Sequence, residues 1–164
     1  MREILFRGKR LQKSVFDDSD WVEGSFIDSG NHSQVAIFPW VNGASTMGLR
    51  QLVNFRMVGV DPDTVGQYTG LTDKNGKKIF EGDILQVSSY GESVDRCVVG
   101  YGQFKPFCYE GTEQVGFYLY WESDKQAFQK YANIGYWLRE RKAICIGNIH
   151  DNPELLEGGA TDGK

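Results

Sequence analysis

Residues 65–87, VGQYTGLTDKNGKKIFEGDILQV, constrain the fold more than any other stretch of this sequence. They hold two tight-turn signals, Asn75-Gly76 and Gly82, set between short apolar runs. Asn-Gly favours the type I′ turn, whose twist fits a β-hairpin. A glycine flanked by two acids favours a tight corner. The pattern therefore predicts a strand, a hairpin turn, a short strand, a corner and a further strand.

The acids of this stretch are open to a chemical and a structural interpretation. Asp73, Glu81 and Asp83 lie close together in sequence, and paired carboxylates can act in general acid–base catalysis when one of them is desolvated. Short acids at turns can instead accept hydrogen bonds from backbone N–H groups. We favour the turn role. The predicted turn residues are Gly70, Asp73, Asn75, Gly76, Glu81, Gly82 and Asp83.

Much of the remaining chain also has β character. Segments rich in valine, isoleucine and aromatic residues are separated by clusters of turn formers. We expect strands over residues 52–60, 94–101, 115–121 and 142–149. Asp61-Pro62 predicts a turn before the central stretch, because Pro62 presets φ and Asp61 can bond the backbone just ahead.

Two segments have helix-start signals. Ser123 with Gln126 three residues later forms a capping-box pattern, which predicts a helix continuing to about Ala132. Asn152 before Pro153 predicts a second, brief helix that ends at a pair of glycines.

The length of 164 residues suits one domain, or one domain with a small appendage. We predict a mainly β fold, α+β at most, with one or two short helices. The expected parts are an N-terminal β segment over residues 1–60, a barrel-like β domain over 61–149, and a short helix with a disordered tail over 150–164.

The sequence offers no recognisable cofactor or metal motif. It has neither G-x-x-x-x-G-K-[ST] nor G-x-G-x-x-G, and its two histidines, His32 and His150, lie far apart. Three cysteines without a C-x-x-C pair are typical of free thiols in a reducing compartment. With no apolar stretch long enough to span a membrane, we expect a cytoplasmic protein that uses no cofactor or metal.

Basic and aromatic residues leave a nucleic-acid interpretation open. Arg7, Lys9 and Arg10 form a basic block near the start of the chain, and Trp121 and Tyr131 belong to an aromatic segment over 117–137 that could stack on bases. A net charge of −4 argues against binding that is driven by overall charge. The structural alternative is a solvated hairpin together with core or subunit-contact aromatics.

Three segments resemble the YopX family of phage and prophage proteins. They are VDPDTVGQYTGLTDKNGKKIFEGDILQV, IGNIHDNPELLEG and the opening REILFRG. That family's opening usually continues with a small residue and Trp-Asp, whereas Lys9-Arg10 stands here. The resemblance covers nearly the whole chain and is weakest over residues 88–140.

The resemblance implies a β-rich fold with barrel-like packing and association into oligomers. It implies no catalytic residues, because the family has no established biochemical function. We therefore expect a non-enzymatic accessory protein of a phage or prophage that self-associates and binds a host or phage macromolecule. The alternatives are a nucleic-acid-binding protein, and a hydrolase that uses the Asp73, Glu81 and Asp83 cluster.

Overall fold

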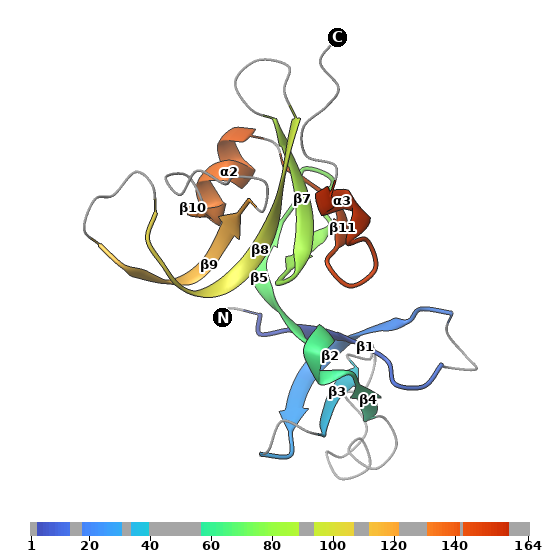
Figure 1. The fold of residues 1–164 in the computed structure, drawn as a ribbon. Coiled ribbons are helices and arrows are strands. Elements are labelled where there is room, and N and C mark those ends of the chain that lie inside the picture. Colours follow the sequence, from blue (N-terminus) through green and yellow to red (C-terminus); the bar gives the residue numbers. More distant parts are fainter. Residues whose placement is uncertain are drawn as a thin grey trace. The chain divides into compact units, whose positions relative to one another are not determined.

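The protein is mainly β, as predicted, with two antiparallel sheets and two short α-helices in its described residues (Figure 1). This computed structural model describes residues 3–13, 18–30, 34–39, 57–88, 94–106, 112–121, 131–141 and 143–157. The chain divides into two compact units, residues 1–68 and 69–164. Each unit is described by itself below.

Unit 1, residues 1–68, is an antiparallel sheet with one apolar face. Its elements are β1 (Phe6–Lys9), β2 (Trp21–Asp28), β3 (Val35–Pro39), β4 (Val58–Val60), the 3-10 helix η2 (Pro62–Thr64) and the start of β5 (Gly66–Thr72). The strand order is β4-β3-β2-β1-β5. Alternating residues of β2 and β3 point inward, so that Val22, Val35 and Ile37 pack with Val60 in its core.

Unit 1 extends beyond the N-terminal segment expected over residues 1–60. The N–H of Lys9 donates to Oγ1 of Thr64 at 2.8 Å, and the N–H of Tyr68 donates to the carbonyl of Leu5 at 2.8 Å. The Asp61 side chain caps η2 by accepting the N–H of Asp63. The bonds of Lys9 and Leu5 attach residues 64–68 to β1 and to the residue before it. A strand was expected over residues 52–60. The described residues of that range contain strand β4.

Unit 2, residues 69–164, contains the second sheet. Strand β5 continues into this unit and lies next to β6 (Lys78–Phe80). The second sheet has the order β10-β9-β8-β7-β11. Its strands are β7 (Asp83–Ser88), β8 (Val94–Phe104), β9 (Gln114–Tyr120), β10 (Tyr131–Asn133) and β11 (Ile144–Asn148).

Helix α2 (Ile134–Arg141) packs on one face of the second sheet, where Ile134 joins a core that includes Leu85, Val99 and Leu119. Helix α3 (Glu154–Glu157) is the brief helix that Asn152-Pro153 predicted. The ladder of described strands runs from β10 at one edge to β11 at the other, so the barrel-like region is an open sheet and not a closed barrel.

The helix predicted over residues 123–132 is wrong at Tyr131 and Ala132, the two residues of this range that the structure describes. Residues 122–130 lie outside the described residues, and Tyr131 and Ala132 form a strand paired with β9. Helix α2 begins later because Asn133 caps it, with Oδ1 accepting the N–H of Gly135 at 2.9 Å. Strand pairing thus prevails over the local capping signal at these two residues. The tail over 158–164 also lies outside the described residues.

Candidate functional site

Asp73 organises the hairpin between β5 and β6. Its Oδ1 accepts the N–H groups of Asn75 at 2.8 Å and Lys77 at 2.9 Å, and its Oδ2 accepts the N–H of Cys145, on β11, at 3.2 Å. Burial alone would raise the pKa of this carboxyl group, but the three N–H groups and the Lys77 charge hold the pKa below its ordinary value. A carboxylate that stays ionised can accept the hydrogen bonds of a turn, but it has no proton to donate as a general acid.

Gly70 and Gly76 supply backbone conformations that other residues avoid. Their φ angles are +84° and +82°, in the left-handed region. The N–H of Gly76 donates to the carbonyl of Asp73 at 3.0 Å. This bond closes a turn with Lys74 and Asn75 at its centre and Gly76 at its last position, and not the expected type I′ turn centred on Asn75-Gly76. Gly76 therefore lies where the chain changes direction. Gly70, predicted as a turn residue, lies instead within strand β5.

The corner between β6 and β7 is built by Gly82 and Asp83. Oδ2 of Asp83, a buried residue, accepts the N–H of Phe80 at 2.8 Å. Gly82 has a φ of +79°; its N–H donates to the carbonyl of Val99 at 2.8 Å and its carbonyl accepts the N–H of Ile149 at 2.9 Å. Glu81 is half-buried at the same corner. The corner is thereby tied to both β8 and the end of β11.

Asn148 arranges the loop that follows β11, a role that the sequence analysis missed. Its Oδ1 accepts the N–H groups of His150 at 2.9 Å and Asp151 at 3.0 Å, and its Nδ2 donates to the Asp151 carboxylate at 3.0 Å. Asn148 is also the register partner of Asp83. An asparagine before a polar turn is the signal that could have found it.

Two of the three clustered acids, Asp73 and Asp83, therefore use carboxylate oxygens to bind backbone N–H groups. They do so at different turns, one against β11 and one at the β6–β7 corner. Within the described ranges, no group of three His, Cys, Asp or Glu residues is suited to hold a metal ion. In this region, the side chains hold the turns in place, and we call this a scaffold role.

Burial makes Cys97 a poor nucleophile. The thiol lies in the core of unit 2, where burial and then the nearby Asp95 charge raise its pKa well above the ordinary value. Cys145 is buried in the same core.

One face of the two-stranded ribbon formed by β8 and β9 is apolar, and part of that face is exposed to solvent. The register pairs Val99 with Leu119, Tyr101 with Phe117, and Gln103 with Val115. The first pair is buried in the core, whereas Tyr101 is 51% exposed and Val115 is 73% exposed. The rings of Tyr101 and Phe117 lie 5.0 Å apart. The face that forms the core near α2 thus continues along the ribbon as an exposed surface.

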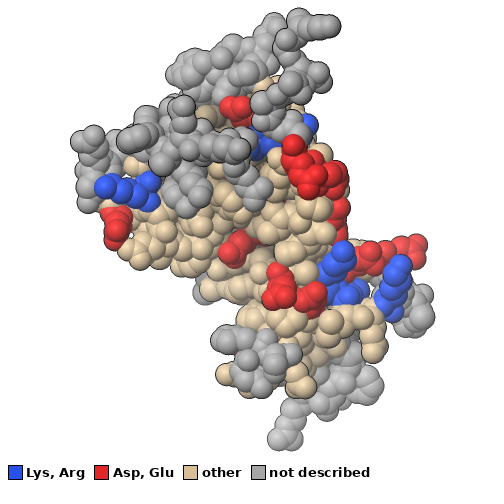
Figure 2. Space-filling view, in the orientation of Figure 1, with Lys and Arg blue, Asp and Glu red and all other residues tan. Residues whose placement is uncertain are grey.

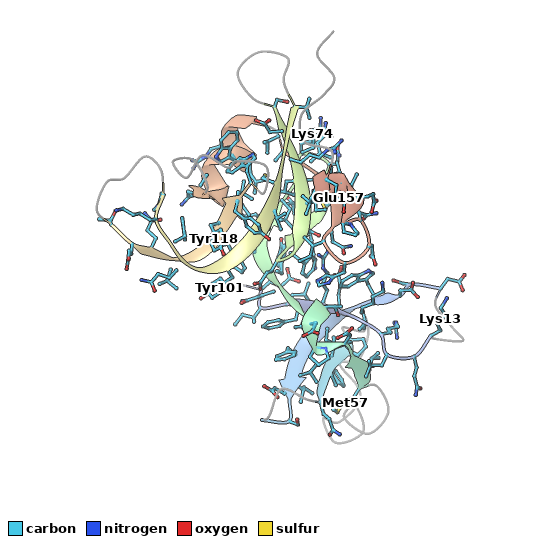
Figure 3. The ribbon with its side chains drawn as sticks, viewed as in Figure 1. Lys13, Met57, Lys74, Tyr101, Tyr118 and Glu157 are labelled. Carbon is cyan, nitrogen blue, oxygen red and sulfur yellow. The ribbon has the colours of Figure 1, made fainter. Side chains whose placement is uncertain are left out.

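The opposite face of the ribbon holds a row of aromatic rings. The ring centroids of Phe104 and Tyr118 are 5.1 Å apart, and those of Tyr118 and Tyr120 are 6.0 Å apart (Figure 3 labels Tyr101 and Tyr118). Gly100, the register partner of Tyr118, leaves room for its ring, because a Cβ there would lie 2.7 Å from Tyr118 Cζ. This glycine is required by packing and not by its φ angle.

The residues proposed for nucleic-acid contact lie in different units. Arg7 and Lys9 belong to β1 and Arg10 directly follows it, all in unit 1. Arg7 lies 4.9 Å from the Trp21 ring, an aromatic partner that the sequence analysis did not select. On the face drawn in Figure 2, Lys and Arg side chains stand among Asp and Glu side chains.

In unit 2, Trp121 packs against the core, with its ring 5.3 Å from that of Trp137. Tyr131 lies in β10, and its side chain is outside the described residues. The aromatic segment therefore contributes at least one of its two selected residues, Trp121, to core packing.

Comparison with known protein families gives a match over most of the chain. The family model described as YopX protein matches residues 22–157. The chain belongs to the YopX family. A crystal structure of protein EF1440 from Enterococcus faecalis is similar to this YopX-family chain at 24% identity, with a TM-score of 0.46, over 95% of this chain and 99% of that one. No curated protein matches. None of the described helices is long and apolar enough to cross a membrane.

Proposed function

We propose that this protein is a non-enzymatic, cytoplasmic accessory protein of a phage or prophage, which self-associates and binds a host or phage macromolecule. The observation that carries the proposal is the exposed apolar face of the β8–β9 ribbon. Val115 and Tyr101 are among the most exposed large apolar side chains of the described chain, and they continue a core face. Exposed apolar surface of this kind marks interaction sites.

The way the acids are used supports a binding role over hydrolysis. A hydrolase built on Asp73, Glu81 and Asp83 needs a carboxyl group with a raised pKa, whereas the pKa of Asp73 is lowered by its backbone donors. Asp83 likewise accepts a backbone N–H at the corner that it builds.

The proposal is tested by light scattering coupled to size exclusion, over a range of protein concentrations. We expect the unchanged protein to form a multimer, and Tyr101→Asp, on β8, to shift it towards the monomer. Val94→Asp is the matched control, because Val94 is also exposed, at 54%, and lies at the other end of β8. A monomer at every concentration, or equal effects of the two variants, would contradict self-association through this face.

Nucleic-acid binding is the second candidate, and the position of Arg7 over Trp21 on unit 1 favours it. Cations next to an aromatic ring can hold phosphate beside a stacked base. The test is the salt dependence of binding to single-stranded DNA. Replacing Arg7, Lys9 and Arg10 by alanine should reduce the slope of log K against log salt, and an unchanged slope would remove these residues from the site.

A further inference from the structure

The outer edge of β8 directs backbone groups away from β9 at Tyr101 and Gln103. Successive residues of an antiparallel strand direct their N–H and C=O groups to alternate sides. The carbonyl of Val99 accepts the N–H of Gly82, on the side of β7. The register between β8 and β9 is regular from Val98 to Phe104, so Tyr101 and Gln103 direct their backbone groups to that same side.

The pairing of β7 with β8 does not reach these two residues. It extends from Ser88↔Val94 to Ile84↔Val98. Beyond Val99, the described part of the chain has no strand along this edge of β8. The edge therefore presents the unpaired N–H and C=O pattern that accepts another strand.

We propose that a second copy of this chain pairs with this edge, β8 against β8, antiparallel and centred on Gly102; the inference rests on the proposed self-association. A two-fold axis at Gly102 places Tyr101 of each copy opposite Gln103 of the other. Both residues direct their backbone groups towards the partner, so each such pair can exchange two hydrogen bonds. The edge is thus complementary to itself, which a two-fold interface requires.

The side chains on the apolar face support the same register. Within one copy, Val115 lies beside Gln103 and Phe117 lies beside Tyr101. Across the axis, this gives a row in the order Val115, Gln103, Tyr101 of the second copy and Phe117 of the second copy. The row would cover part of the Tyr101 side chain that is exposed in a single copy. Gly102 adds no side chain at the axis.

The other edge of the ribbon is less suited to two-fold pairing. Strand β10 already pairs with Tyr118–Tyr120 of β9. Pairing centred on Val115 keeps clear of those residues, but it would place the charged Glu113 opposite Phe117 of the second copy. A carboxylate against an aromatic side chain is unfavourable when the contact excludes water. The chemistry of the two edges therefore selects β8.

The decisive comparison is Gln103→Pro against Gln103→Ala. Proline removes the N–H that points to the partner, and this N–H is not used in the pairing with β9. Alanine removes the side chain and keeps the N–H. We expect Gln103→Pro to raise the dimer dissociation constant about tenfold or more, as expected for lost backbone bonds at both symmetric positions, while Gln103→Ala changes it by less than about threefold. Equal effects of the two variants would overturn edge pairing.

Amide hydrogen exchange of the unchanged protein provides a readout that does not depend on how the proline variant folds. We expect the amides of Tyr101 and Gln103 to become protected as concentration rises through the dimer range. Dimerisation without this protection would overturn the β8 edge and leave self-association standing. A protein that stays monomeric would overturn both. Protection by an added extended peptide, without dimerisation, would replace the second copy with a different strand donor.

Discussion

The turn region and the β8–β9 ribbon both lie in unit 2, but they use their side chains in opposite ways. The turn region comprises the β5–β6 hairpin, the β6–β7 corner and the loop after β11, where the side chains of Asp73, Asp83 and Asn148 bind backbone N–H groups. On the ribbon, Tyr101 and Val115 extend a core face into solvent. The turn region holds most of the sequence motifs, and the ribbon holds almost none.

A dense sequence motif can thus mark residues that shape the fold, and not a binding surface. Turns need particular residues, because only a few side chains reach a backbone N–H nearby and glycine tolerates a positive φ best. A contact surface can be built from ordinary apolar residues in a strand. The most recognisable part of this chain is therefore not its candidate binding surface.

The largest expected effect is at the β5–β6 hairpin of the turn region. Asp73→Ala leaves three backbone N–H groups without their acceptor, and we expect a loss of about 3 kcal/mol or more in the free energy of unfolding. Urea denaturation measures this loss. The neighbouring exposed residue provides the control, since Lys74→Ala should change stability by less than about 0.5 kcal/mol. Similar losses in the two variants would remove the distinction between scaffold and surface.

The contribution of Asp73 should depend on pH. Its pKa in the folded protein is below the ordinary value of 3.8, so its stabilisation is complete at neutral pH and is lost as the pH falls below that value towards the folded pKa. We expect the difference in unfolding free energy between the unchanged protein and Asp73→Asn to shrink from pH 7 to pH 3. A difference that grew on acidification would show that the sign of the pKa shift is wrong.

An intermediate effect is expected where the ribbon itself is packed. Gly100→Ala brings a Cβ within 2.7 Å of the Tyr118 ring, and we expect a cost of about 1–3 kcal/mol. In the background Tyr118→Ala the same glycine change should cost clearly less, because the ring is gone. A double-mutant cycle in urea measures the coupling, and strictly additive costs would place the strain elsewhere.

The smallest effect is expected on the exposed face. Val115→Ser should change the unfolding free energy by less than about 0.5 kcal/mol, because Val115 is 73% exposed in a single copy. The measurement is made at concentrations below those of self-association. A large loss there would mean that Val115 belongs to the core of unit 2, and the comparison between the turn region and the ribbon would fail.

Local chemistry made a large part of the fold predictable. Pro62, Gly76 and Gly82 indicated the turns before and within the central stretch, and Asn152-Pro153 indicated α3, because these residues act over a few neighbours. The helix predicted over 123–132 was wrong at Tyr131 and Ala132, which pair with β9. That pairing depends on β9, a different segment of the chain. A capping pattern involves only neighbouring residues and therefore cannot predict the pairing.

The family, the mainly β class and the positions of the tight turns were predictable from the sequence, since they follow from motifs and from short-range backbone preferences. The folded structure was needed to show that Asp73 reaches the N–H of Cys145, that Asn148 lies opposite Asp83, and that Tyr101 and Val115 share an exposed face. These facts depend on strand register and sheet order. Register joins residues far apart in the chain, so no local pattern specifies it.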